Sequence, residues 1–442
     1  MKARNGFLHW VFPAMLAVVG LTALLSGRDL SKMFLELQEG SGVLHPAIPW
    51  AQRAVSILLL AAAGERIVSH LALHKRMPSP VLTIAFVGYW LTTVAAPAFF
   101  GRHPQISHEY LYPLILGLAG LLTTVPERDR IIGASRGALL IFLLLGVLLV
   151  PVLPALVLDG SYKQGLIPGL PRLGGLAPHP VALGMFTLIT IIFLWCRPLR
   201  NRWLNRAAWL LSLGVLFMAQ SKTAWVAFVL VTLCMLAVRN GPSLWRRLGD
   251  PRESAFGIVV CLGAMLVAVG LLAVVLFANL GAQLTDFSQS AEGAELISLT
   301  GRDQIWTIAV EEWHASPVFG YGPGLWDDAF RASINMPNAT NAHNQFMDTL
   351  ARSGTVGAVG LVIYACVLLA MSVRYARTTG GLSLALFISL ALISVSEVPL
   401  ILFGYGTELF AHLLLVITLA SAAGARVAVP QVRARPAYRT AL

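Results

Sequence analysis

Long apolar runs separated by short polar segments dominate this chain from end to end. A hydrocarbon core about 30 Å thick is crossed by roughly 20 apolar residues in a helix. Judged by that length, the pattern predicts an all-α polytopic membrane protein. It predicts twelve membrane-spanning helices, at approximately 10–26, 54–72, 79–99, 109–125, 136–157, 178–196, 207–220, 223–239, 255–277, 355–374, 380–402 and 407–424.

One polar segment, residues 278–353, is much longer than the other connections. A helical pattern runs through 302–314, and the glycines of 320–324 interrupt it. A second helix is expected to begin near Gln345 and to continue through Gly354 into the tenth span. The chain then divides into spans one to nine in 1–277, a large, partly helical loop in 278–353, spans ten to twelve in 354–424, and a basic tail in 425–442.

The composition supports the membrane prediction. The chain is 57% hydrophobic and 12% charged, whereas an ordinary soluble domain is about 25% charged. A net charge of +11 could indicate a nucleic-acid-binding protein, but the basic residues are spread over short loops and form no basic face.

The distribution of lysine and arginine predicts the orientation in the membrane. The N-terminus, the tail and five loops on the same side hold 21 of the 32 basic residues. These segments should be cytoplasmic, because short cytoplasmic loops are enriched in lysine and arginine. Both termini are then inside, the first apolar run is a retained helix, and the long loop is outside, which is the periplasm if the source is Gram-negative.

The four cysteines lie in or at the ends of apolar runs, and no CxxC motif occurs; they are Cys196, Cys234, Cys261 and Cys366. Neither a disulfide framework nor a metal site is expected from this pattern, and no cofactor is implied.

The outward side collects unusual polar residues. Arg172 precedes the sixth span, Lys222 lies between the seventh and eighth, and Arg302 opens the helical stretch of the long loop. Basic groups at one depth can bind a diphosphate. His343 is expected beside a helix N-terminus, where unpaired N–H groups favour an anion.

Simpler explanations remain open for each of these residues. Interfacial Arg and Lys often extend only to lipid headgroups, and a single loop histidine is often solvated. Glu397, in the predicted eleventh span, can act as a proton relay or pair with a neighbouring helix. Three carboxylates could bind a divalent cation without forming a recognised ligand pattern: Asp327, Asp328 and Asp348.

The order of the motifs is specific. An Arg-Leu-x-Gly…His-Pro loop is followed by Ser-Lys-Thr at a helix start, then Gly-Arg…Trp, Pro-x-x-Gly-x-Gly, and His-Asn before a span. This order, from Arg172 to Gly357, resembles the O-antigen ligase/polymerase superfamily, which includes the Wzy-type and exopolysaccharide polymerases. The resemblance implies a GT-C-like glycosyltransferase architecture. The first five spans carry no motif of this kind.

The resemblance also implies roles for individual residues. His343 would be the base that takes a proton from an acceptor hydroxyl, and Arg302 would contact the donor diphosphate. Lys222 stands where the family has arginine, so the charge is kept without the bidentate geometry. The residues expected to bind the diphosphate or sugars are Arg172, Lys222, Asn344, Tyr321 and Trp326.

The implied function is a polysaccharide polymerase that joins oligosaccharide repeat units carried on polyprenyl (undecaprenyl) diphosphate. Transfer would be metal-independent and inverting, at the periplasmic face. Its partners would be the lipid-linked donor, an acceptor glycan, membrane lipid and a chain-length regulator. The alternatives are an O-antigen ligase with lipid A-core as acceptor (lipopolysaccharide synthesis), a lipid-linked sugar transporter, a membrane acyltransferase using His343, and a scaffold.

Overall fold

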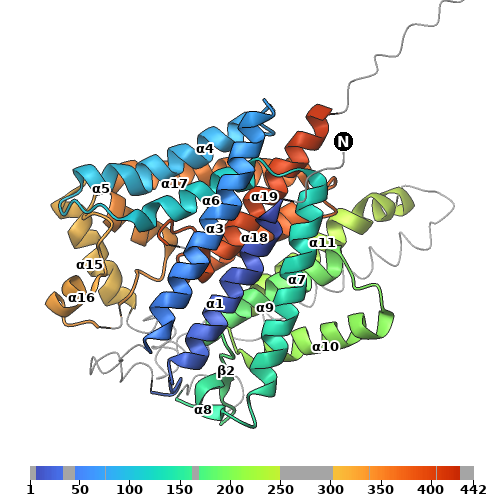
Figure 1. Cartoon of the computed structure of the whole chain (residues 1–442), viewed down its shortest axis with the longest axis horizontal. Helices are drawn as coiled ribbons and strands as arrows, with labels where there is room; N and C mark the ends of the chain where they lie inside the picture. The colour runs from blue at the N-terminus through green and yellow to red at the C-terminus, as the bar shows by residue number, and fades with distance from the viewer. Residues whose placement is uncertain are drawn as a thin grey trace, which may run out of the picture.

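The computed structural model describes residues 6–32, 45–74, 76–161, 169–248, 302–337, 339–404 and 406–428. These residues form a helical bundle with one two-stranded sheet, in which Leu158 pairs with Leu173 (Figure 1). The α-helices and strands described in the first half are α1 (Val11–Leu25), α3 (Ala47–Ala72), α4 (Pro80–Trp90), α5 (Ala96–Phe100), α6 (Leu111–Leu121), α7 (Val125–Leu148), α8 (Pro154–Val157), β1 (Leu158–Asp159) and β2 (Arg172–Leu173). The second half contains α9 (Pro180–Cys196), α10 (Arg202–Met218), α11 (Lys222–Leu248), α15 (Arg302–Ala315), α16 (Asp328–Ser333), α17 (Gln345–Tyr375), α18 (Leu382–Ile393) and α19 (Thr407–Ala428).

Among the described residues, seven helices are long and apolar enough to cross a membrane, and α9 and α18 are shorter apolar helices. The twelve predicted spans therefore remain a prediction. The ninth, 255–277, lies outside the described residues. The fourth, 109–125, contains the end of a short 3-10 helix (His108–Tyr110) and the eleven-residue α6, which stops at Leu121 because a new helix, α7, begins at Val125 with Thr124 as its N-cap.

Helix α19 forms the centre of the bundle. In its most apolar 18-residue stretch 83% of the residues are buried, against 22–44% in the other six candidate spans. Helix α19 is therefore surrounded by other parts of the protein, whereas the other six leave more of their surface uncovered. It packs against α6, α7, α17 and α18. Phe410 lies edge-to-face against Phe12 and Phe186, with ring centroids 4.9 Å and 5.4 Å apart, a favoured aromatic geometry.

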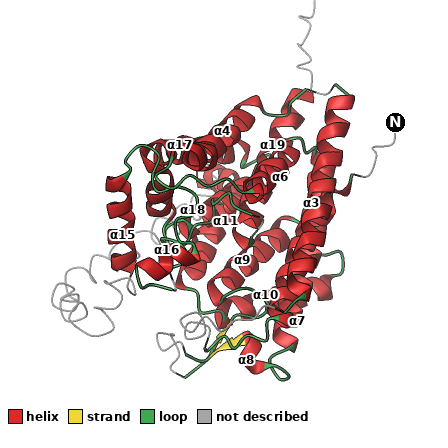
Figure 2. Cartoon of the chain, turned by 60° about the vertical axis from the view of Figure 1, so that its left-hand side comes forward, coloured by secondary structure: helices red, strands yellow, loops and turns green. Residues whose placement is uncertain are grey.

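The predicted cytoplasmic segments contact one another at one end of the bundle. Arg197 forms an ion pair with Asp129 at 2.7 Å. Arg239 donates hydrogen bonds to the carbonyl oxygens of Trp195 and Gly380. The start of α1 and the end of α19 lie toward the same end (Figures 1 and 2). This arrangement is the one expected if these segments share one side of a membrane.

The predicted outward segments meet at the opposite end. Arg28 donates to the carbonyl oxygens of Leu156, Gly175 and Pro178, at 2.9–3.4 Å. One arginine thus connects the end of α1 to the residues before β1 and to the residues after β2. Arg172 in β2 in turn donates from Nε to the carbonyl of Ala219, 3.2 Å away, at the end of α10.

The described part of the long loop packs beside α17 (Figure 2). Its two helices, α15 and α16, enclose a small apolar cluster; its buried members are Ile305, Ala309, Leu325, Trp326, Phe330, Ala339, Ala342 and Ala351. As predicted, a helix covers 302–314; it ends at Ala315, before Pro317 and the glycine-rich segment 320–324.

Helix α17 begins at Gln345, as predicted, but it is interrupted at Gly354, which has φ +63°. The segment that follows α15 packs against this interruption. Thr355 and Val356 donate from their backbone N–H groups to the carbonyls of Pro317 and Val318. A Cβ atom on Gly354 would lie 2.3 Å from the carbonyl oxygen of Val318. Only glycine combines this backbone conformation with such close contact.

The prediction that Glu397 lies inside a membrane-spanning helix, 380–402, is wrong. Helix α18 ends at Ile393, and Glu397 lies in the non-helical segment before α19. Buried non-helical backbone needs partners for its polar groups. Residues 398–400 are buried, and the contacts that satisfy this segment are described below.

We predict that Gly354→Ala destabilises the protein, because it adds a side chain where φ is positive and the backbone of Val318 is in contact. The expected loss is about 1–3 kcal/mol. Gly133→Ala in α7 is the matched control, since a Cβ atom there meets nothing within 4 Å. The control should be neutral or stabilising by about 0.5–1 kcal/mol. Melting temperatures of the purified variants in detergent measure both effects, and equal melting temperatures would contradict the assignment.

Candidate active site

His343 stands at a sharp corner before α17. Its φ is +46°, a left-handed conformation that is uncommon for a residue other than glycine. Its backbone N–H donates to Oδ1 of Asn341 at 2.7 Å. The preceding residue, Ala342, is held twice, by Asp348 Oδ1 at 3.1 Å and by Trp306 Nε1 at 2.9 Å. The long loop and α17 therefore fix this corner together.

The next two residues connect this corner to the segment before α19. Asn344 caps α17 by accepting from the N–H groups of Phe346 and Met347, and it donates from Nδ2 to the carbonyl of Val395 at 3.3 Å. The backbone of Gln345 donates to the carbonyl of Ser394, and its side-chain oxygen accepts from Leu400 N–H at 2.8 Å. Both ends of the 394–400 segment are thus anchored to the start of α17.

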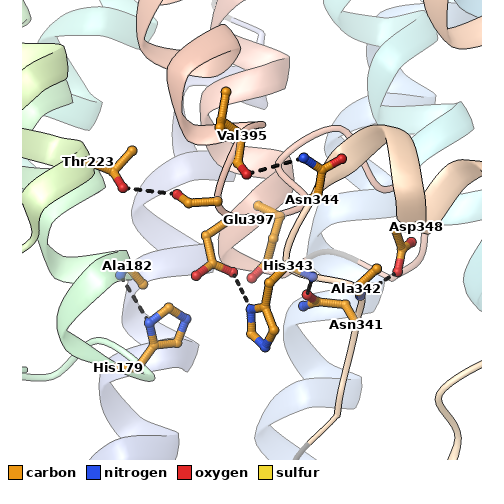
Figure 3. Close-up of polar contacts among 12 residues, drawn as sticks. His179, Ala182, Thr223, Asn341, Ala342, His343, Asn344, Asp348, Val395 and Glu397 are labelled. Carbon is orange, nitrogen blue, oxygen red and sulfur yellow. Dashed lines mark hydrogen bonds and ion pairs between the residues drawn. The ribbon is translucent and has the colours of Figure 1, made fainter. Parts of the chain in front are cut away.

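Glu397 projects from that segment to His343. Its Oε2 lies 3.3 Å from Nδ1 of His343 (Figure 3). Both side chains are partly accessible, 17% for the glutamate and 27% for the histidine. Because an ionised carboxylate can only accept, Nδ1 carries the proton in this pair. Nε2 of His343 is then the nitrogen with a free lone pair, as a general base requires.

Glu397 lies outside the helices and is surrounded by basic groups. Burial alone would raise the pKa of its carboxyl. The hydrogen bond with His343 and the proximity of His179 and Arg302 outweigh this effect, so the pKa of Glu397 is lowered from its ordinary value. The carboxylate is therefore ionised at neutral pH, and it can stabilise positive charge that forms on His343.

Three of the predicted basic residues lie around this pair. Arg302, the first residue of α15, interacts electrostatically with Glu397, and Arg172 interacts with His179. Lys222, the first residue of α11, is exposed. Its neighbour Thr223 forms a hydrogen bond with Ser396, with the two hydroxyl oxygens 3.0 Å apart. The starts of α11 and α15 therefore border the segment that carries Glu397.

Two other predicted residues pack within the loop. Tyr321 lies with its ring 4.3 Å from the ring of His103. Trp326 is only 4% exposed and lies edge-to-face on Phe330 at 5.5 Å. Among the described residues neither ring has a recorded contact with His343. Asn344, as described above, uses its amide to cap α17 and hold Val395, so the structure gives all three side chains a role in the fold.

Each carboxylate considered for cation binding has another partner. Asp327 caps α16 by accepting from Phe330 N–H, Asp328 pairs with Arg331, and Asp348 pairs with Arg352. Within the described ranges, no group of three or more His, Cys, Asp or Glu side chains is arranged to hold a metal ion. Cys196, Cys234 and Cys366 are free thiols, and Cys261 lies outside these ranges.

Sequence reasoning did not assign Glu397 and His179 to the site. Glu397 was noticed as a charge in an apolar run, a signal that left a proton relay and simple pairing equally open. His179 belongs to the His-Pro motif, but no spacing rule links position 179 to 343 or 397. Only the fold brings the three together.

Asp348 is a buried link between the loop and α17. Its Oδ2 accepts from Arg352 Nε at 2.8 Å, and Arg352 also donates to the carbonyl of Pro323 at 2.7 Å. The side chains of Asp348 and Arg352 are 2% and 8% exposed. A buried guanidinium that loses its carboxylate partner is costly, because its charge is then unpaired in a poorly hydrated place.

We predict that Asp348→Asn lowers the free energy of unfolding by about 3–5 kcal/mol, as for other buried pairs that lose one member. Asp328→Asn is the control, because that carboxylate is 96% exposed, and it should cost about 0–1 kcal/mol. Thermal unfolding of both variants tests this difference. Equal losses would mean that the pair with Arg352 is not a structural link.

A family model described as O-antigen ligase matches residues 207–362. The match covers α10, α11, α15, α16 and the first half of α17, and so includes Lys222, Arg302 and His343. It excludes His179 and Glu397. No curated protein matches the chain. The match confirms the resemblance drawn from the motifs: over residues 207–362 the chain is similar to the O-antigen ligase/polymerase superfamily.

Proposed function

We propose that this protein is a polysaccharide polymerase that joins oligosaccharide repeat units carried on polyprenyl diphosphate. The family match supports a function of the O-antigen ligase/polymerase type, acting on lipid-linked glycans. The apolar helices together with the family support a bacterial membrane protein. Our proposal adds the inner membrane, a periplasmic site and cytoplasmic termini, on the basis of the distribution of lysine and arginine.

The hydrogen bond between His343 and Glu397 is the observation that carries the proposal. A histidine with Nδ1 bound to a carboxylate and Nε2 free is arranged as a general base. The acceptor in glycan polymerisation is a sugar hydroxyl, which attacks more readily as its proton is removed. In our scheme Nε2 of His343 takes that proton, and Glu397 stabilises the resulting imidazolium.

The proposed step breaks one bond and forms one. The acceptor oxygen bonds to the anomeric carbon of the donor sugar, and the bond from that carbon to the diphosphate oxygen breaks. The electron pair leaves with polyprenyl diphosphate, and the proton of the hydroxyl passes to His343. Direct attack inverts the anomeric configuration.

Basic side chains balance the charge on the leaving diphosphate in this scheme. Arg302 borders Glu397, and Arg172 and Lys222 begin neighbouring elements at the same end of the bundle. Fixed cations aimed at developing negative charge are a large source of catalysis, and guanidinium groups match phosphate oxygens in pairs. This is why we propose a metal-independent transfer.

An O-antigen ligase is the second candidate function, favoured by the description of the matching family. The chemistry at His343 would be the same, with lipid A-core in place of a growing chain as the acceptor. The two activities therefore differ in the acceptor and leave different intermediates in a cell that lacks the protein.

We predict that deletion of this gene removes long polysaccharide and leaves single repeat units on polyprenyl diphosphate. Gels of surface and released polysaccharide, with mass spectrometry of lipid-linked intermediates, test this. Long polymer that remains on the carrier and is absent from lipid A-core would identify a ligase. Unchanged polymer and intermediates would contradict both functions and favour transport of another lipid.

We predict that His343→Ala lowers polymer formation by about 10²–10⁴-fold, the usual contribution of a general base, at normal protein level. His314→Ala is the control: this exposed histidine on α15 contacts only the neighbouring Trp313 ring among its recorded interactions, and its loss should leave polymer unchanged. Complementation of the deletion strain with each variant gives the comparison. Wild-type polymer yield with His343→Ala would disprove the base assignment.

A further inference from the structure

His179 is a second histidine at the site, outside the residues that the family model matches. It is the N-cap of α9, has extended backbone angles, and is followed by Pro180 at the first helical position. Its ring Nδ1 accepts a hydrogen bond from the backbone N–H of Ala182 at 3.3 Å. Histidine is unusual here, since Ser, Thr, Asp and Asn are the preferred N-cap residues.

This cap determines where the proton of the imidazole resides. A backbone N–H can only donate, so Nδ1 of His179 must offer a lone pair and the ring proton must be on Nε2. Burial lowers the pKa of His179, although the nearby carboxylates of Glu397 and Glu408 oppose this effect. His179 is therefore a neutral imidazole at neutral pH, with one hydrogen-bond donor at Nε2.

His179 and Glu397 are electrostatic neighbours in the site. In Figure 3 the two histidines lie on either side of the Glu397 carboxylate, and the nitrogen of His179 that is not bonded to Ala182 is on the side of the carboxylate. His179 and Glu397 interact electrostatically with each other, as do His179 and His343. Oε2 of Glu397 is used by His343, and within the described part of the chain no hydrogen bond to Oε1 is seen, so that oxygen can accept from a second donor.

The loop that carries His179 is held firmly in place. Arg28 donates to the carbonyl oxygen of Pro178, the residue before His179, at 3.0 Å, and to that of Gly175 at 2.9 Å. Gly174 and Gly175 both donate to the carbonyl of Val157. Arg28 thus fixes the backbone that precedes His179, and the N–H of Ala182 fixes the imidazole itself. Such double fixation is expected of a side chain that orients another group.

We propose that His179 is a positioning residue of the active site, which donates from Nε2–H to the Glu397 carboxylate and so keeps this carboxylate directed at Nδ1 of His343. Glu397 would then be held between two imidazoles with different tasks. His343 exchanges the proton of the acceptor hydroxyl, and His179 stays neutral and supplies a fixed donor. This inference rests on the proposed function of His343, and its test separates the two.

The decisive variant keeps the cap and removes the donor. His179→Asn retains a side-chain acceptor for the N–H of Ala182, since asparagine is a favoured N-cap, but it does not place a ring N–H beside Glu397. His179→Ser is a second capping variant, in case asparagine disturbs folding. Glu397→Gln and the double variant His179→Asn/Glu397→Gln complete a cycle that measures whether the two residues act together.

The variants are purified into proteoliposomes and supplied with lipid-linked oligosaccharides extracted from a strain that lacks this gene. We expect His179→Asn and His179→Ser to melt at the wild-type temperature, to keep the donor KM, and to lose kcat by about tenfold or more, a part of the general-base contribution. In the Glu397→Gln background, His179→Asn should cause no further loss.

Two results would overturn the inference. Wild-type kcat in both capping variants would show that His179 only caps α9, and a double variant that loses the product of the two single losses would show that His179 does not act through Glu397.

An inactive wild-type protein would instead refute the proposed function. The inference then still has its own readout, ¹⁵N NMR of labelled histidines. The signal absent from His179→Asn must show a neutral ring protonated at Nε2 and must shift in Glu397→Gln; a charged or Nδ1-protonated ring contradicts the inference.

Discussion

The hydrogen bonds between the start of α17 and the segment before α19 are the constraint on which the site depends. Gln345 accepts from Leu400 N–H and donates to the carbonyl of Ser394, and Asn344 donates to that of Val395. Backbone that leaves helical form at membrane depth must find partners within the protein. Here those partners are the residues that directly follow His343. The same bonds that stabilise the non-helical segment therefore place Glu397 against His343.

The position of α17 depends in turn on the docking of the long loop. The segment from Pro317 to Gly322 forms backbone hydrogen bonds with residues on both sides of Gly354. The buried Asp348–Arg352 pair adds a second connection, because Arg352 donates to the carbonyl of Pro323 and Asp348 accepts from the N–H of Ala342. The loop also contacts the connection after α5, where Arg102 pairs with Glu312 at 3.2 Å. Elements outside the family match, including the loops that carry Arg28 and His179, complete the arrangement.

The sequence predicted those helices of the site whose positions depend on neighbouring residues in the chain. The helix from Arg302 and the helix start at Gln345 both lie where the sequence places them. Glu397 was misplaced because a largely apolar run conceals a helix end: α18 stops at Ile393, while apolar residues resume at Val398 and continue to Phe403. Asn344 caps α17, a structural role that the sequence analysis did not assign to it, and its expected contact with substrate stays a prediction. The approach of positions 179, 343 and 397 could not be predicted, because it arises from packing of separate helices.

Release of polyprenyl diphosphate by the purified protein is the most direct test of the central claim, that this end of the bundle catalyses glycosyl transfer from a lipid diphosphate. Proteoliposomes containing the wild-type protein receive lipid-linked oligosaccharides from the deletion strain, and mass spectrometry counts released carrier and new glycosidic bonds. The account predicts one carrier released for each bond formed, with inverted anomeric configuration by NMR. Donor that crosses the membrane unchanged, with no carrier released, would contradict it.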